Sequence, residues 1–149
     1  MGVLAKNKKA YFDYDILETY EAGIVLTGQE VKSIKLGRMS LKGAFVVFKD
    51  EELYLIGAKV PPYQPYNTPK SYDPERSRKL LLKKNEIKHL IGKSKEKGLT
   101  LIPLKVYTKY AKIKLEFGLG KGRKKEDKRT VIKKREQKRD IERELKTRG

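Results

Sequence analysis

Lysine and arginine are the residues of this sequence whose number and spacing could do chemistry. The 149 residues include 37 Lys and Arg against 19 Asp and Glu, which gives a formal charge of +18 at pH 7. Cationic side chains at this density attract a polyanion, and nucleic acid is the usual one because its phosphates release counterions on binding. A charge that serves only solubility is the alternative. Charge and pattern together favour nucleic-acid binding.

The residues that most often carry out catalysis are scarce. The sequence has no cysteine and one histidine, His89, and it contains neither an H-E-x-x-H sequence nor a P-loop. The adjacent acids Glu51 and Glu52 fall in a polar stretch typical of a hairpin turn, where their carboxylates would face solvent. We therefore expect a protein that is not an enzyme and that uses no metal and no cofactor.

The expected location is the cytoplasm. A chain without cysteine suits a reducing compartment. It has no apolar stretch of the roughly 20 residues that a membrane span needs, and the N-terminus lacks the apolar core of a signal peptide. We expect no membrane partner.

Six antiparallel strands are expected, in three pairs. Apolar and polar residues alternate in three segments, each long enough for two strands: residues 11–26, 43–60 and 99–120. The first segment could instead be one strand bent at Gly23, and Pro103 in the last indicates an edge or a bulge. Such a sheet removes its exposed edges by closing, so we expect a mainly β fold, a small closed or partly open barrel with short helices.

Two helices are expected between the strand pairs. Thr27 and Glu30 have the spacing of a capping box at the start of a helix over residues 28–36. Asn85 is the expected N-cap of the second helix, and Gly98 supplies its stop.

A proline-rich loop, residues 61–78, leads into a basic cluster. The loop holds five prolines and three tyrosines, a density that neither a helix nor a central strand tolerates. Arg76, Arg78 and Lys79 could bind phosphate beside stackable rings, although a solvated cluster is the alternative. If the next residues form a strand, Leu81 lies on its exposed face and could contact a base or sugar.

The chain divides into a folded part, residues 1–120, and a basic tail, residues 121–149. The tail holds 14 basic and 6 acidic residues and few apolar ones, so we expect it to be disordered in the free protein. Gly122 could serve as a hinge, and from residue 123 to 148 the tail has neither proline nor glycine. It can therefore become helical where anionic walls cancel its repulsion.

Three stretches together resemble small protein B, the bacterial family that binds SsrA RNA, also called tmRNA. They are "NKKAYFDYDILETYEAGIVLTGQEVKSIKLG", "RSRKLLLKKNEI" and "KGRKKEDKRTVIKKRE", and the resemblance covers nearly the whole chain. It implies a six-stranded antiparallel barrel of the oligonucleotide-binding (OB) type. It also implies binding to the tRNA-like domain of tmRNA and delivery to the A site of stalled ribosomes, which is ribosome rescue by trans-translation. The tail would become helical in the empty mRNA channel.

The resemblance also implies roles for individual residues. RNA binding is expected of Asn7, Lys8, Lys9, Glu30, Lys32, Ser33, Lys35, Arg38, Arg76, Arg78, Lys79 and Leu81. Contacts with the ribosome and its decoding site are expected of Gly122, Asp127, Lys128, Arg129, Lys133, Lys134 and Arg135. Glu30 could serve as a helix cap instead of, or as well as, an RNA ligand. Elongation factor Tu and alanyl-tRNA synthetase would be indirect partners through tmRNA, and a monomer is expected.

Two other functions are alternatives. A general ribosomal protein or RNA chaperone would bind many RNAs with little preference. An RNA-processing enzyme would cleave RNA with magnesium, although the scattered acids give it little support.

Overall fold

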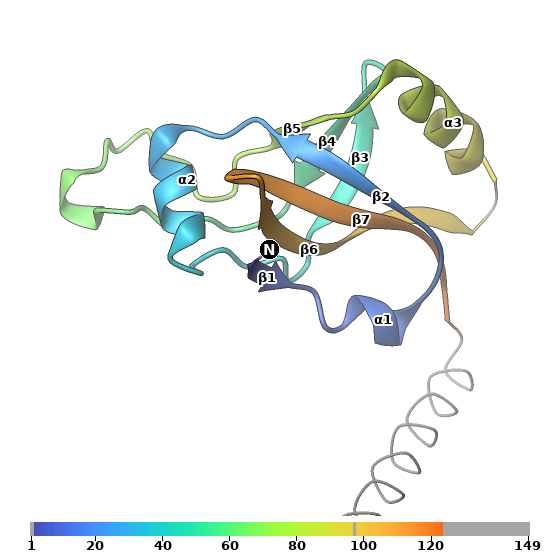
Figure 1. Cartoon of the computed structure of the whole chain (residues 1–149), viewed down its shortest axis with the longest axis horizontal. Coiled ribbons are helices and arrows are strands. Elements are labelled where there is room, and N and C mark those ends of the chain that lie inside the picture. The colour runs from blue at the N-terminus through green and yellow to red at the C-terminus, as the bar shows by residue number, and fades with distance from the viewer. Residues whose placement is uncertain (1, 97, 124–149) are drawn as a thin grey trace, which may run out of the picture.

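The structure is a computed structural model that describes residues 2–96 and 98–123 (Figure 1). The tail residues for which ribosome contacts are expected, other than Gly122, lie outside the described residues: Asp127, Lys128, Arg129, Lys133, Lys134 and Arg135.

The described residues form one antiparallel sheet of seven strands. They are β1 (Val3–Lys6), β2 (Tyr14–Ile24), β3 (Phe45–Lys49), β4 (Glu52–Ile56), β5 (Arg78–Leu81), β6 (Leu99–Lys109) and β7 (Lys112–Gly122). The hydrogen-bonded order is β1-β6-β3-β4-β5-β2-β7, and β7 pairs back with β6. Six strands therefore form a closed circuit of pairings, while β1 pairs with a separate part of β6 at Lys105–Tyr107. The mainly β, antiparallel expectation is confirmed.

The sheet has seven strands where six were expected, and the difference arises in the segment 11–26 and at two short strands. The segment 11–26 contributes a single strand, β2, preceded by one helical turn, α1 (Ala10–Asp13), so Phe12 is not in a strand. β1 and β5 have four residues each, too few for alternation to identify them.

Two longer helices and a short 3-10 helix join the strands. They are α2 (Gly28–Lys35), η1 (Pro65–Asn67) and α3 (Lys84–Ser94). The capping box of α2 is confirmed, because Glu30 N donates to Thr27 Oγ1 at 3.2 Å and Thr27 N donates to Glu30 Oε1 at 2.9 Å. The expected N-cap of α3 is wrong. Lys83 is the N-cap, its N–H donating to Glu86 Oε1 at 3.3 Å, and Asn85 lies inside the first turn.

Both tight hairpins turn on residues with positive φ. Asp50 and Glu51 connect β3 to β4 with φ of 52° and 61°, and Tyr110 and Ala111 connect β6 to β7 with φ of 51° and 63°. Two successive positive φ values match the twist of the flanking strands. The second turn therefore lies within the segment 99–120, between β6 and β7. The irregularity expected at Pro103 is confirmed as a register shift between Pro103 and Lys105.

Alternate residues of the strands fill the interior as expected. The buried faces carry Val46, Leu53, Leu55, Leu80, Leu101, Val106, Ile113, Leu115, Phe117 and Leu119, with Ile34 of α2 and Leu90 of α3 packed in the same cluster. Each large apolar side chain buried in this way stabilises the fold by about 1.5–3 kcal/mol. Val31 of α2 and Ile87 of α3 are partly buried against the same core, so each helix packs on the sheet through a few apolar residues. Within the described part, no helix is both long enough and apolar enough to cross a membrane.

We expect Gly57→Ala to destabilise the protein. Gly57 has φ of 76°, and a Cβ there would lie 2.9 Å from the carbonyl oxygen of Gly43. The left-handed backbone alone costs an alanine about 1–2 kcal/mol. Gly92→Ala in α3 is the matched control, because a Cβ at Gly92 meets nothing within 4 Å and should stabilise the helix by about 0.5–1 kcal/mol. Urea unfolding measures the free energy of unfolding of both variants. Equal values for Gly57→Ala and Gly92→Ala would contradict the proposed need for glycine at position 57.

Candidate nucleic-acid interface

A buried carboxylate, Glu30, fixes α2 to the rest of the fold. Only 1% of Glu30 is exposed, and Arg78 is 0% exposed. Arg78 Nε donates to Glu30 Oε2 at 2.6 Å, and Arg76 Nη2 donates to Glu30 Oε1 at 2.6 Å. We call Glu30, Arg76 and Arg78 the Glu30 cluster. It joins α2 to β5 and to the end of the proline-rich loop.

The remaining donors of the cluster bind backbone oxygens. Arg78 donates to the carbonyl oxygens of Ala58 and Pro74, each at 3.0 Å, and Arg76 Nη2 donates to that of Val25 at 3.2 Å. Burial by itself would raise the pKa of Glu30. The hydrogen bonds from Arg76, from the Thr27 backbone and from Arg78 outweigh burial and hold that pKa below its usual value.

The proline-rich loop is attached along one side of α2. Ser33 Oγ donates to the carbonyl oxygen of Pro61 at 2.6 Å, and Arg38 donates to that of Tyr63 at 3.2 Å. Thr68 Oγ1 lies 3.2 Å from Gln29 Oε1, to which it donates. Together with the Arg76 contact, these bonds fix the loop at several points along the helix. Figure 1 shows the loop extending from α2 away from the sheet.

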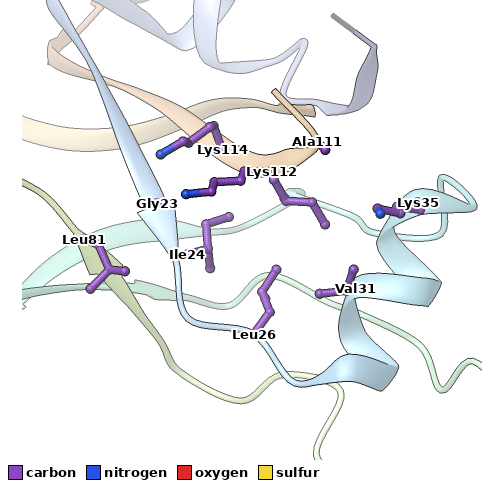
Figure 2. A pocket seen from close by; sticks show the side chains of 10 residues that line it. Gly23, Ile24, Leu26, Val31, Lys35, Leu81, Ala111, Lys112 and Lys114 are labelled. Carbon is purple, nitrogen blue, oxygen red and sulfur yellow. The ribbon is translucent and has the colours of Figure 1, made fainter. Parts of the chain in front are cut away.

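A groove of about 360 Å³ lies between α2, the ends of β2 and β5, and the start of β7 (Figure 2). We call it the basic groove. Its lining residues are Gly23, Ile24, Leu26, Val31, Lys35, Leu81, Ala111, Lys112, Ile113 and Lys114. Its three charged lining residues are all lysines, and the others are apolar or glycine, so the groove offers cationic groups over an apolar floor.

Gly23 keeps the middle of the basic groove open. It pairs with Leu81 of β5 on one side and with Lys114 of β7 on the other. A Cβ at Gly23 would lie 3.4 Å from Leu81 Cβ and 3.8 Å from Lys114 Nζ. Because glycine has no side chain there, Leu81 stays 53% exposed and faces the groove, as expected for the outer face of a strand.

A second hollow of about 600 Å³ adjoins the basic groove at the β6–β7 turn. It is lined by Lys35, Thr108, Lys109, Tyr110 and Ala111, and it shares Lys35 and Ala111 with the groove. Tyr110 is 90% exposed, and Lys109 Nζ lies 5.9 Å from the centroid of its ring. An exposed ring beside lysines is the arrangement on which unpaired bases stack.

The residues expected to bind RNA do not all lie at this surface. Lys35 and Leu81 line the basic groove, and Lys32 and Arg38 lie on α2 and the turn after it, where solvent reaches them. Glu30, Ser33 and Arg78 are buried with their polar atoms bonded inside the protein, so in this conformation they position other groups rather than touch a ligand. Arg76 belongs to the same cluster but remains partly exposed.

The other expected RNA ligands lie on other elements. Asn7 Nδ2 donates to the Pro103 carbonyl oxygen at 2.9 Å, beside the exposed Lys8 and Lys9. Lys79 Nζ pairs with Glu52 at 2.9 Å. RNA contacts by these residues stay predictions.

The sheet continues past residue 120, where we expected the folded part to end. Gly122 is the last residue of β7 and pairs with Tyr14, and Arg123 N donates to the Asp13 carbonyl oxygen at 2.8 Å. Gly122 is therefore part of the sheet in this structure.

Sequence reasoning missed Lys112 and Lys114 as candidate ligands. Alternation places both lysines on the polar face of the last strand, where they look like ordinary solvent-facing residues. The alternation of apolar and polar residues does not show that α2 and β5 lie opposite that face. Tyr110 is exposed because it lies in the turn between β6 and β7.

Comparison with known proteins gives the family. The chain matches the family model described as SmpB protein over residues 4–147. The chain belongs to the SmpB protein family. Relatives named "SsrA-binding protein" include that of Sulfurihydrogenibium sp. (strain YO3AOP1), 52% identical over 144 residues, which are 97% of this chain and 94% of the relative. That of Carboxydothermus hydrogenoformans is 50% identical over 146 residues, 98% of this chain and 97% of the relative. The resemblance to small protein B is thus confirmed.

A solved structure supports the same assignment. A chain in the structure described as "tmRNA-SmpB: a journey to the center of the bacterial ribosome" is 44% identical to this chain. The match has a TM-score of 0.66 and covers 85% of this chain and 92% of that one.

We expect Glu30→Gln to lower the free energy of unfolding by about 3 kcal/mol, because it leaves the buried Arg78 guanidinium without its counter-charge. Glu52→Gln is the control, since it affects only partly exposed contacts, the pair with Lys79 and the hydrogen bond from the Tyr54 hydroxyl, and should change stability little. The pKa of Glu30 is lowered in the folded state, so its stabilisation is present above the unfolded pKa of about 4.3 and is lost as the pH falls below it.

Urea unfolding at neutral and acidic pH checks this expectation. The difference between the unaltered protein and Glu30→Gln should shrink on acidification. A difference at neutral pH no larger than that of Glu52→Gln would show that the Glu30 cluster does not hold α2.

Proposed function

We propose that this chain is an RNA-binding adaptor of trans-translation. It binds the tRNA-like domain of tmRNA and delivers it to the A site of stalled ribosomes, without catalysing a reaction itself. Membership of the SmpB protein family carries this proposal, because its close relatives are named SsrA-binding protein and the matched solved chain belongs to a tmRNA–SmpB structure. Work on the ribosome implies a cytoplasmic location.

The basic groove is the proposed binding surface for tmRNA. Lys35, Lys112 and Lys114 would contact phosphates, and Leu81 would contact a base or sugar. The lysines give affinity for any RNA. The fixed shape of the groove and the exposed ring of Tyr110 determine how the RNA is positioned on the protein. The Glu30 cluster contributes by holding α2 and the loop.

The closed circuit of strands is proposed to be a barrel of the OB type. The support is the return of the pairings to β6 and the match in fold to the solved chain. OB-type barrels commonly bind oligonucleotides on one face and with their loops, and the basic groove lies on such a face beside the β6–β7 turn.

The basic segment after Arg123 is proposed to enter the empty mRNA channel of the ribosome. Its Asp127, Lys128 and Arg129, followed by Lys133, Lys134 and Arg135, would contact the decoding region. The folded part would meanwhile hold the tRNA-like domain, through which elongation factor Tu and alanyl-tRNA synthetase are indirect partners.

We expect the double variant Lys112→Gln/Lys114→Gln to bind tmRNA more weakly and with less dependence on salt. Removal of one lysine–phosphate interaction should reduce the slope of log affinity against log salt by about one. The control, Lys42→Gln/Lys49→Gln, removes the same charge from exposed sites outside the groove. Filter binding over a range of salt, with tRNA and ribosomal RNA fragments as competitors, provides the measurement.

Two outcomes would contradict the proposal. Equal decreases in affinity in the two double variants would mean that total charge, not the groove, binds the RNA. Equal competition by every RNA would favour a general RNA chaperone.

We expect truncation after Arg123 to keep tmRNA affinity and to abolish peptide tagging on stalled ribosomes. The cut lies beyond β7, so the sheet stays complete. A full-length chain with residues 124–149 in scrambled order is the matched control, and it should also fail to tag. Tagging is measured in a reconstituted translation system with an mRNA that lacks a stop codon. Normal tagging by the scrambled chain would show that only the charge of the segment matters.

A further inference from the structure

A cavity of about 300 Å³ lies between α2 and the proline-rich loop. We call it the loop cavity, and its lining residues are Gly28, Gln29, Lys32, Tyr63, Gln64 and Asn67. It shares none of them with the basic groove. Its volume is at the lower end for ligand pockets, which suits one small planar group.

Carboxamides dominate the polar lining of the loop cavity. Gln64 and Asn67 use their side chains in no hydrogen bond with the described part of the chain. Gln29 has its oxygen engaged with Thr68, which leaves its amide nitrogen as a donor. A carboxamide offers a donor and an acceptor side by side, the pattern that pairs with the edge of a nucleobase.

An aromatic ring and a cation complete the lining. Lys32 Nζ lies 5.5 Å from the centroid of the half-buried Tyr63 ring. Such a ring stacks on a base of any identity, and an adjacent ammonium group can bind the phosphate next to it. The lining contains no carboxylate to repel that phosphate.

The cavity wall is held in place before any ligand arrives. The Arg38–Tyr63 and Thr68–Gln29 bonds fix the loop at the cavity itself, and the Ser33–Pro61 bond fixes the start of the loop. The single hydrogen of the Thr68 hydroxyl is shared between Gln29 Oε1 and the carbonyl oxygen of Gln64, which lies closer to Thr68 Oγ1 at 2.6 Å. A preorganised wall lowers the entropy cost of binding.

We propose that the loop cavity binds a single unpaired nucleobase of the RNA that occupies the basic groove. The base stacks on Tyr63 and is read by the carboxamides of Gln29, Gln64 and Asn67, while Lys32 contacts its phosphate. The proposal rests on the proposed function and adds a second, base-reading site to it.

Two independent variants test the site without removing an internal contact. Gly28→Leu places a side chain at the cavity, where a Cβ meets nothing within 4 Å. Gln64→Leu/Asn67→Leu removes two exposed carboxamides and keeps side chains of similar size. Gly92→Leu, also at a helical glycine with open space, controls for the added side chain. Asn85→Leu controls for removal of an exposed carboxamide, and it also removes the hydrogen bond that the Glu86 N–H donates to Asn85 Oδ1.

The readout is 2′-hydroxyl acylation of full-length tmRNA at single-nucleotide resolution, with and without the full-length protein. With the unaltered chain and with both controls, we expect protection of an unpaired nucleotide. With either test variant, that nucleotide should become reactive again while the other protected nucleotides stay protected. The affinity for tmRNA should fall about tenfold, which corresponds to the loss of one stacked base.

The possible outcomes distinguish failure of the base-binding site from failure of the proposed tmRNA-binding function. If the test variants protect the same nucleotides with the same affinity as the controls, the loop cavity binds no base, although the groove still binds tmRNA. If the unaltered chain protects nothing in tmRNA, the proposed function fails, and the base site with it.

Discussion

The ion pair between Glu30 and Arg78 is the interaction on which the candidate interface depends. Removing two charges from water costs several kcal/mol per ion, and here Arg76, the Thr27 N–H and two backbone carbonyls offset that cost with hydrogen bonds. The pair joins elements that are far apart in sequence, α2 and β5, and Arg76 adds the end of the proline-rich loop. The position of α2 in turn determines both the basic groove and the loop cavity.

Acidic and basic residues are distributed so that the proposed binding surfaces keep a positive charge. Several carboxylates on the sheet pair with neighbouring cations, as Glu52 does with Lys79 and Glu116 with Lys105. Lys35 and Lys112 at the groove form no ion pair with the described residues. The lysines give long-range attraction to RNA, and the carboxamides and rings beside them give the contacts that depend on shape.

The elements predicted correctly are those with local signals. The capping box of α2 needs only Thr27 and Glu30, and the polar turn of the β3–β4 hairpin needs only its own residues. The N-cap of α3 was wrong because the Lys83 N–H finds the Glu86 carboxylate, which places the helix start two residues earlier. β1 is stabilised by pairing with β6, about a hundred residues away, and its four residues carry too little pattern to reveal it.

The candidate site was less predictable because it depends on tertiary contacts. Arg78 was expected to bind phosphate within a basic cluster, yet it lies two residues before the buried Leu80 in β5 and so points to the same interior face. That alternation was visible in the sequence. The groove and the loop cavity were not, since both exist only where α2 meets segments distant along the chain.

Hydrogen–deuterium exchange of the full-length protein, free and bound to tmRNA, tests most directly whether α2 lies at the centre of the RNA-binding surface. We expect slower exchange on binding in residues 23–38, 61–68 and 108–114, and little change in the β3–β4 hairpin. Slower exchange confined to the β3–β4 hairpin and α3, with α2 and the β6–β7 turn unchanged, would contradict this expectation.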